Sequence, residues 1–450
     1  MLIKNVSELT SKGNVRGRKV ILKIVEEALE KVNYFTILKE LVCLEKNILK
    51  IRDFELNLDK FRNIYLIGGG KNSSFMTSAI EEILGNRLTE GIVIEKKGCL
   101  NKKTKIVCSR GGHPLPDSDS VKSAYKIAKM VRKTKQEDLI IVCVSGGWTA
   151  LTSNPEEGIT LKELQKTYKL LLKSGMTVEQ MNIVRNRLTQ LGRGKILSMA
   201  NGATIVGLIA VDEVEGKPWG PTVFDSSAPS DGIKILEDFN LFEKIPLSVK
   251  KYLVKENLKK KTMRETGFQH NSQSPHNFVM ADNSLLCKAA QDIASNFGIK
   301  SFLLSTSIRG EAKDVGRVIA SISKEISRFR RPFEPPCIIV AGGETTVTIV
   351  GKSGKGGRNQ EMVLSAAQDI EGVSNIVIAS VATDGIDGPT EIAGAIVDGT
   401  TMKNVKEKGL SITKELSYHN SSYVLEKISD AIYTFDTATN LMDLILVYIS

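Results

Sequence analysis

Residues suited to binding an anion follow the first clear apolar strand pattern of the sequence. The turn Gly68–Ser73 (GGGKNS) carries Lys71 behind three glycines, and a helical pattern begins at Ser73. Glycines let a backbone approach an anion closely, and the first turn of a helix offers free N–H groups. We predict that Gly69, Gly70 and Ser73 bind an anion beside the charge of Lys71. A tight structural turn is the alternative.

A second turn of the same kind follows the apolar run LIIVCV. It joins one hydroxyl to two glycines, in the order Ser145, Gly146 and Gly147. Ligands of parallel α/β sheets bind where strands end and loops lead into helices. We therefore predict that this turn binds a phosphate or a carboxylate, with a plain turn as the alternative.

The third turn is a loop rich in glycine and lysine. Residues 351–357 hold four glycines, with Lys352 and Lys355 between them, and Arg358 opens a helical pattern. The loop lacks the glycine spacing of a Walker A motif, but its charge favours a polyphosphate. The pattern predicts a mobile loop, or else a flexible surface hairpin. The glycines predicted to bind phosphate are Gly354, Gly356 and Gly357.

The fourth turn is acidic. Asp384 and Asp387 alternate with glycines directly after the apolar run IVIASVA. Mg²⁺ in proteins is commonly held by one or two carboxylates together with phosphate oxygens. The turn therefore predicts a magnesium site, and the alternative is that both aspartates cap turns or helices.

The elements that must position these turns form an α/β protein. Continuously apolar strand patterns alternate with amphipathic helix patterns, which indicates parallel sheets covered on both faces. The tract 246–275 is poor in apolar residues, so we predict two domains, 1–245 and 276–450, joined by a linker. Residues 345–350 are expected to form a strand, and the first sixty residues show helical periodicity.

Composition narrows the class of protein. The 450 residues carry a formal net charge of +11, spread along the chain with one denser run at 250–264 that reads as a solvated helix or linker. No nucleic-acid-binding signature is present, so we predict no nucleic-acid partner. Neither a membrane-spanning apolar stretch nor a signal-peptide core occurs, which predicts a cytoplasmic protein with no membrane contact.

Six motifs together resemble the glycerate 2-kinase family, whose C-terminal part is called the MOFRL domain. They occur in the family's order over residues 65–445, and the last two are the most specific. The motifs are GGGKNS at 68–73, GGHPLPD at 111–117, VSGGWTAL at 144–151, EQMNIVRNRL at 179–188, GGETTVTIVGKSGKGGRNQE at 342–361 and ATDGIDGPTEIAGAIVDG at 382–399.

The resemblance implies an enzyme that uses ATP and Mg²⁺ to phosphorylate D-glycerate, usually at the 2-hydroxyl. It implies a Rossmann-like N-terminal domain facing a C-terminal α/β domain across a cleft, and it is compatible with a homo-oligomer. The family's active-site lysine and arginine fall on Lys71 and Arg358, and the arginine of its Asn-x-Val-Arg motif falls on Arg185. Lys195, in a stretch that departs from the family pattern, is added as a further binding residue.

A mechanism follows as a hypothesis from this resemblance. Lys71 and Arg358 would neutralise the transferring phosphoryl group or the glycerate carboxylate, since phosphoryl transfer depends mainly on positioning and charge. Asp212, which follows the apolar run ATIVGLIAV, would accept the proton of the alcohol, and Glu344 would join the two aspartates at Mg²⁺.

Two alternatives remain beside the kinase. A hydroxypyruvate reductase would use Gly68–Ser73 with Glu95 as a dinucleotide-binding turn. A catalytically impaired relative would only bind a nucleotide or a sugar acid. That reading is motivated by departures from the family pattern, such as Trp148 where a small residue is usual and the altered stretch 434–440.

Overall fold

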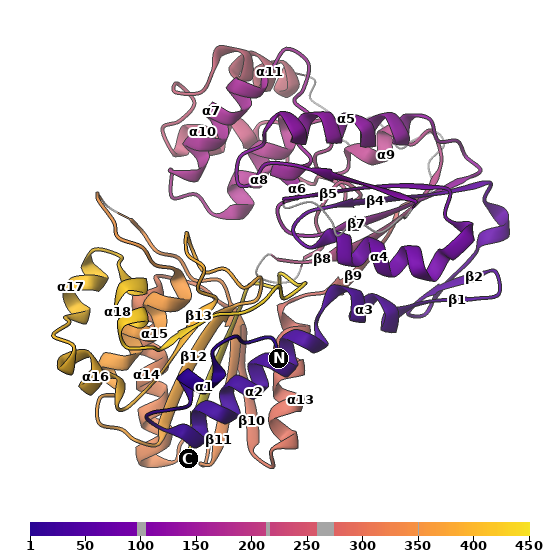
Figure 1. Ribbon diagram of the computed structural model, residues 1–450. Coiled ribbons are helices and arrows are strands. Elements are labelled where there is room, and N and C mark those ends of the chain that lie inside the picture. The colour runs from indigo at the N-terminus through magenta and orange to yellow at the C-terminus, as the bar shows by residue number, and fades with distance from the viewer. Residues whose placement is uncertain (97–104, 213–216, 259–273, 350) are drawn as a thin grey trace. The chain divides into compact units, whose positions relative to one another are not determined.

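The computed structural model describes residues 1–96, 105–212, 217–258, 274–349 and 351–450. These residues form two compact units. Unit 1 combines Met1–Asn33 with Ala281–Ser450, and unit 2 comprises Tyr34–Glu213 with Lys217–Met280. Each unit has its own sheet, coloured by residue number in Figure 1.

The division differs from the predicted domains at both predicted limits. The first 33 residues belong with the C-terminal part of the chain, and the predicted linker begins with a helix of unit 2, α11 (Leu247–Leu258). Val249 and Leu253 of α11 are fully buried. These apolar side chains are too widely spaced among lysines to stand out in the sequence. The rest of the predicted linker, 259–273, lies outside the described residues.

Unit 2 is built on a six-stranded sheet with the order β6-β5-β4-β7-β8-β9. The pairs β4–β5, β4–β7, β5–β6 and β7–β8 are parallel, as predicted. Its central strands are buried along their whole length, which explains their continuous apolar sequences. The strands are β4 (Asn63–Gly69), β5 (Glu90–Glu95), β6 (Ile106–Arg110), β7 (Asp138–Val144), β8 (Thr204–Ala210) and β9 (His276–Ala281).

Helices cover both faces of this sheet. α4 (Ser73–Leu84) packs on one face with α3 (Tyr34–Leu41), and α5 (Ser118–Arg132) packs on the other with α9 (Lys195–Met199) (Figure 1). Helical periodicity was predicted for the first sixty residues, but the last part of this segment forms a small antiparallel sheet. Its strands are β1 (Val42–Glu45), β2 (Ile48–Ile51) and β3 (Phe54–Asn57).

A second layer of unit 2 is helical and has its own apolar core. That core includes Leu164, Tyr168, Val184 and Leu253, all completely buried. Figure 1 shows these helices grouped together at the end of the unit. They are α7 (Leu161–Leu172), α8 (Val178–Arg187), α10 (Asp231–Asp238) and α11, and the short α6 (Trp148–Leu151) lies beside α8.

Unit 1 has a mixed six-stranded sheet with the order β10-β11-β15-β12-β13-β14. β15, the last strand in the sequence, lies in the middle and runs antiparallel to both neighbours. Of the predicted strand at 345–350, residues 345–349 form no strand, and Thr346 makes only an isolated bridge to Glu311; residue 350 lies outside the described residues. The strands are β10 (Lys300–Ile308), β11 (Cys337–Gly343), β12 (Ile376–Ala382), β13 (Gly394–Asp398), β14 (Ala431–Ile432) and β15 (Asp443–Ile449).

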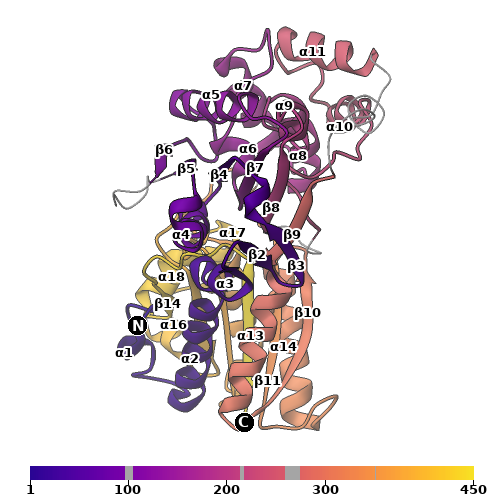
Figure 2. The same ribbon diagram turned by 90° about the vertical axis from the view of Figure 1, so that its right-hand side faces the viewer.

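The helices of unit 1 lie in two layers around this sheet. α2 (Val15–Lys31) and α13 (Asn283–Asn296) pack side by side on one face, as Figure 2 shows. α14 (Ala312–Phe329) and α15 (Arg358–Asp369) pack on the other face. The remaining helices are α1 (Val6–Leu9), α16 (Thr401–Glu407), α17 (Ile412–Ser417) and α18 (Ser421–Lys427).

A buried ion-pair network holds the N-terminal segment to the C-terminal part of unit 1. The Arg18 side chain is completely buried; its Nε lies 2.6 Å from Asp398 and its Nη1 2.8 Å from Asp430. Burial alone would raise the pKa of Asp398, but Arg18 and the hydrogen bonds outweigh it and lower that pKa. Stability that depends on ionised Asp398 is therefore present above its ordinary pKa and lost as the pH falls through the lower folded value.

We expect Arg18→Met to destabilise unit 1 by about 3–5 kcal/mol, because two buried carboxylates lose Arg18, although Asp430 retains Lys12 as its cation. Lys23→Met removes an exposed pair with Glu27 on the same helix and should cost less than about 1 kcal/mol. Hydrogen exchange of the β12 and β15 amides, followed by mass spectrometry, measures the difference. Equal protection in both variants would contradict a stabilising role for the network.

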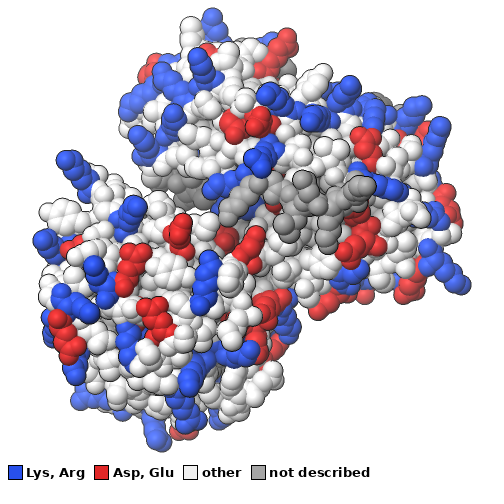
Figure 3. Space-filling model, in the orientation of Figure 1, with Lys and Arg blue, Asp and Glu red and all other residues white. Residues whose placement is uncertain are grey.

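No helix in the described part of the chain combines the length and the apolar character needed to cross a bilayer. On the face of the molecule seen in Figure 3, Lys and Arg are interspersed with Asp and Glu.

Candidate functional site

The structure brings the first two predicted turns of unit 2 into direct contact. β4 and β7 are neighbouring parallel strands, so their carboxyl ends meet at one edge of the sheet. The Lys71 N–H donates to the Gly146 carbonyl at 2.6 Å, and the Ser145 hydroxyl donates to the Lys71 carbonyl at 2.7 Å. The backbone of Lys71 is thus fixed by the second turn, independently of its side chain.

Glycine is required where these turns approach each other. Gly70 has a φ of +119°, and a Cβ there would lie 2.2 Å from the Ser145 carbonyl oxygen. A Cβ on Gly69 would lie 2.6 Å from the Trp148 ring, which is itself 1% exposed and donates from Nε1 to the Leu191 carbonyl. Trp148, an unusual residue for the resembled motif, therefore fills the core beneath the turn.

The N-terminus of α4 carries a carboxylate from the protein itself. Glu95, 8% exposed, accepts the Ser74 N–H at 2.5 Å. Ser73 is fully buried and donates to the Gly70 carbonyl. Glu95 thus occupies the N–H group of Ser74, and anion binding by Ser73 stays a prediction. Glu95 also contacts the helix instead of standing ready for a ribose, which removes the only support for the dinucleotide reading.

Arg185 of α8 is a buried cation with unused donors. The residue is 8% exposed, and its guanidinium carbon lies 4.8 Å from the centroid of the Tyr168 ring. Among the described residues, its Nε and Nη2 have no hydrogen-bond partner. Burial lowers the pKa of Arg185. A buried guanidinium with unpaired donors is costly unless an anion joins it, so Arg185 fits a phosphate or a carboxylate.

Lys195 has a structural role that differs from its prediction. Its Nζ lies 2.5 Å from the Glu156 carboxylate and also donates to the carbonyls of Arg187 and Thr189. An ammonium group has three donors, so this set uses all of them. Asp212, the predicted base, follows β8 by two residues and is half-buried.

In unit 1, Arg358 opens α15 between two carboxylates. Its Nε and Nη2 donate to the two oxygens of Asp443 at 2.6 and 2.9 Å, and its Nη1 lies 3.0 Å from Glu344. Burial opposes the charge, but Asp443 and Glu344 outweigh it and raise the pKa of Arg358 well above its ordinary value. The arginine is therefore a fixed cation with a defined orientation.

Asp387 is a helix cap. It is 1% exposed, and its two oxygens accept the backbone N–H and side-chain amide groups of Asn359 and Gln360 at 3.0–3.2 Å. Burial raises its pKa. Carboxylates are stabilised at helix N-termini in this way.

The three predicted magnesium ligands all contact protein groups in the structure. Glu344 pairs with Arg358, Asp387 caps α15, and one oxygen of Asp384 accepts the Ile386 N–H within its own turn. Within residues 1–96, 105–212, 217–258, 274–349 and 351–450, no group of three or more His, Cys, Asp or Glu is placed to hold a metal ion. A magnesium ion held by one or two of these carboxylates together with phosphate oxygens stays a prediction.

The glycines of the 351–357 loop are explained by close packing. A Cβ on Gly354 would lie 2.4 Å from Asn420, one on Gly356 2.3 Å from Ser421, and one on Gly357 2.2 Å from Asp387. The Gly354 N–H also donates to the Tyr418 carbonyl at 2.6 Å. The second half of the loop is thus packed against the α17–α18 connection.

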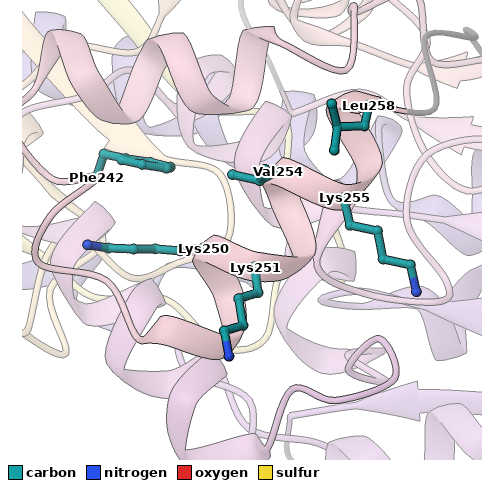
Figure 4. A pocket seen from close by; sticks show the side chains of 6 residues that line it. All are labelled: Phe242, Lys250, Lys251, Val254, Lys255 and Leu258. Atoms are coloured by element: carbon teal, nitrogen blue, oxygen red, sulfur yellow. The ribbon is translucent and has the colours of Figure 1, made fainter.

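A groove of about 400 Å³ runs along α11 (Figure 4). None of the residues that line it was predicted to be a site residue. The groove is lined by Phe242, Lys250, Lys251, Val254, Lys255 and Leu258. Lys250 lies 2.5 Å from Glu243 and 5.6 Å from the centroid of the Phe242 ring. The aliphatic parts of the lysine side chains in the groove cover apolar surface, and their ammonium groups reach solvent. This is what is expected of the solvated helix that was predicted for the basic run.

The predicted residues thus form two groups, one in each unit. Lys71, Ser145 and the neighbouring glycines meet in unit 2, and Arg358 lies in unit 1 with the 351–357 loop. Sequence reasoning missed Glu95 as a cap and Asp443 as the partner of Arg358. The apolar run Leu444–Ile449 could have indicated a strand. Asp443, the polar residue just before that run, would then stand at the start of the strand.

Comparisons with known proteins find two family models and several relatives that match this chain. A family model described as a domain of unknown function (DUF4147) matches residues 20–254, and the MOFRL family model matches residues 337–443. A glycerate 2-kinase from Pyrococcus horikoshii is 37% identical over 96% of this chain and 97% of its own length. A putative hydroxypyruvate reductase from Agrobacterium vitis is 31% identical over 84% of this chain and 97% of its own.

The solved structures include a glycerate kinase from Thermotoga maritima that matches with a TM-score of 0.79. It is 31% identical, and the match covers 96% of this chain and 99% of that one. Sequence and fold therefore agree over nearly the whole length, and the chain belongs to the glycerate kinase family, with a DUF4147 and a MOFRL part.

Proposed function

We propose that this protein is a glycerate 2-kinase, which transfers the γ-phosphoryl group of ATP to the 2-hydroxyl of D-glycerate. The observation that carries the proposal is the similarity to a glycerate 2-kinase over 96% of the chain. The fixed cation Arg358 and the unpaired donors of Arg185 support it, since both suit anionic substrates.

The step itself needs charge neutralisation and positioning. The glycerate hydroxyl oxygen bonds to the γ-phosphorus, the bond from that phosphorus to the bridging oxygen breaks, and ADP leaves with its electron pair. Asp212 accepts the hydroxyl proton in this proposal. Lys71 and Arg358 neutralise charge on the transferring group, and Arg185 holds a carboxylate or a phosphate.

Mg²⁺ is expected to accompany ATP, since it neutralises phosphate charge. Given the geometry of Asp387 and Glu344, the ion would be held by phosphate oxygens and water, with no protein cage. ATP as the donor is in keeping with the predicted cytoplasmic location, and a homo-oligomer stays a prediction.

The test is to incubate the protein with Mg-ATP and D-glycerate and to identify the products by phosphorus NMR. We expect ADP and 2-phosphoglycerate. The matched assay supplies NADH or NADPH with hydroxypyruvate, because one relative carries the reductase name. Oxidation of the nicotinamide cofactor without formation of ADP would overturn the kinase proposal and favour the reductase.

We expect Asp387→Asn to lower stability and leave the metal requirement unchanged. The substitution replaces an acceptor of four hydrogen bonds at the start of α15, and such a loss costs about 1–3 kcal/mol. Thermal unfolding and the Mg²⁺ concentration for half-maximal rate are the measurements. Asp384→Asn, in the exposed part of the same turn, is the control. A raised metal requirement with unchanged stability would restore Asp387 as a ligand.

A further inference from the structure

Three parts of the unit 1 sheet end at the same edge. β15 runs antiparallel to β11 and β12, so its first residue, Asp443, pairs in register with Gly343 and Ala382 at the carboxyl ends of those strands. Glu344 and the 383–390 turn follow directly. This topology places a side chain from the start of β15 among the loops that end the neighbouring strands, where α/β proteins carry their sites.

Asp443 holds Arg358 through two parallel hydrogen bonds. Its side chain is 3% exposed, whereas that of Arg358 is 29% exposed. The Asp443 carboxylate also accepts a hydrogen bond from the Asn359 side-chain amide at 2.9 Å. The Asp443 backbone carbonyl accepts one from the Asn283 side-chain amide at 3.0 Å. Asp443 is thus fixed from both its main chain and its side chain before it contacts the arginine.

The donors of Arg358 are unequally used. A guanidinium has five N–H donors. Asp443 takes the donor on Nε and one of the two donors on Nη2, and Nη1 forms an ion pair with Glu344. The two terminal nitrogens together carry four donors, of which Asp443 uses one through a hydrogen bond. A pair of terminal donors matches the two oxygens of a phosphate or a carboxylate.

We propose that Asp443 is a positioning residue for the transfer reaction, which orients Arg358 so that the terminal edge of its guanidinium meets the reacting anion. This inference rests on the proposed function. Asp443 does not touch substrate. It acts by fixing the angle and the charge of Arg358.

The rival reading is that Asp443 merely stabilises the fold, as Asp430 does. Asp430 also pairs with an arginine in the same unit, but there both partners are completely buried and no edge of Arg18 reaches solvent. The two sites therefore provide a comparison, since the same Asp→Asn change removes the carboxylate charge from each; at Asp430 it also removes an ion pair with Lys12.

The experiment measures kcat, KM and thermal unfolding for wild type, Asp443→Asn and Asp430→Asn. We expect Asp443→Asn to lower kcat about 10- to 100-fold, because small misplacements of a group at the reacting centre are costly. Asp430→Asn should lower stability with kcat unchanged. Asp443→Glu retains the buried charge but shifts the carboxylate by one methylene, so it should fold and still lose kcat.

A double variant shows whether the effect passes through Arg358. In the Arg358→Ala background, Asp443→Asn should cause no further loss of kcat. A normal kcat in both Asp443 variants, or an equal further loss in that background, would overturn the positioning role while the wild type still makes phosphoglycerate. A wild type that makes no phosphoglycerate would instead overturn the proposed function, and this inference with it.

Discussion

Arg358→Ala is expected to lower kcat on the order of 10²-fold or more, because in the proposed mechanism it removes a charge-assisted contact to the transferring phosphoryl group. Arg358→Lys should restore little of this loss. Lysine lacks the planar fork that reaches Asp443 and two ligand oxygens together. Steady-state kinetics with Mg-ATP and D-glycerate give the values. A normal kcat with only a raised KM would show that Arg358 binds substrate without assisting the step.

The stability of this variant needs its own control. Arg358 contacts a carboxylate that is 3% exposed, so truncation leaves Asp443 buried without a cation. The fold is therefore expected to be destabilised by this change, although Arg358 lies at the start of a helix and not within the core. The double variant Arg358→Ala/Asp443→Asn removes the unpaired charge. Its kcat should stay as low as that of Arg358→Ala, and its unfolding temperature should lie above that of the single variant.

Lys71→Ala should lower kcat to a similar extent while leaving the fold unchanged. The backbone of Lys71 is held by Gly146 and Ser145, and these bonds survive loss of the side chain. Lys251→Ala, in the groove of α11, is the matched control and should have no effect on kcat. An active Lys71→Ala variant would mean that the residue implied by the family resemblance is not the catalytic cation of this chain.

Combining the two changes tests whether both residues act on one reacting group. They belong to different units of the chain. If they act together, Lys71→Ala/Arg358→Ala should cost less than the product of the single losses. Multiplicative losses would indicate independent roles.

Some strands were predictable because a strand that is covered on both faces has a mostly apolar sequence. β4, β7, β8 and β12 are apolar throughout since both faces of each are covered, and the turns after them were located correctly. The strand expected at 345–350 was wrong for its described residues. Within residues 345–349, only Thr346 finds a bridge partner.

The site was less predictable than the strands, because glycine and acidic turns serve two purposes. Gly354 and Gly357 were assigned to phosphate binding from their type, whereas the structure shows that each lies where a Cβ would collide with Asn420 or Asp387. Glu95 and Asp387 carry the negative charge that a ligand was expected to bring to α4 and α15. A sequence cannot distinguish a helix N-terminus that awaits an anion from one already capped.

The placement of Met1–Asn33 was out of reach of pattern analysis. α2 packs so closely that a Cβ on Gly17 would lie 2.6 Å from Tyr448 and Val377. These contacts join residues that are hundreds of positions apart, and helical periodicity says nothing about which sheet a helix covers. The amphipathic pattern was sufficient to predict the helix but not its partner.

The pairing of Arg18 with residues 380 and 412 positions later has a consequence for synthesis on the ribosome. The first 33 residues emerge first, yet their partners in β13, β14 and β15 emerge last. Unit 2 is encoded between them and can complete its sheet while α2 still waits with its apolar face uncovered. Domains generally fold as units during synthesis. Unit 1 can therefore complete its sheet only after unit 2 has been synthesised.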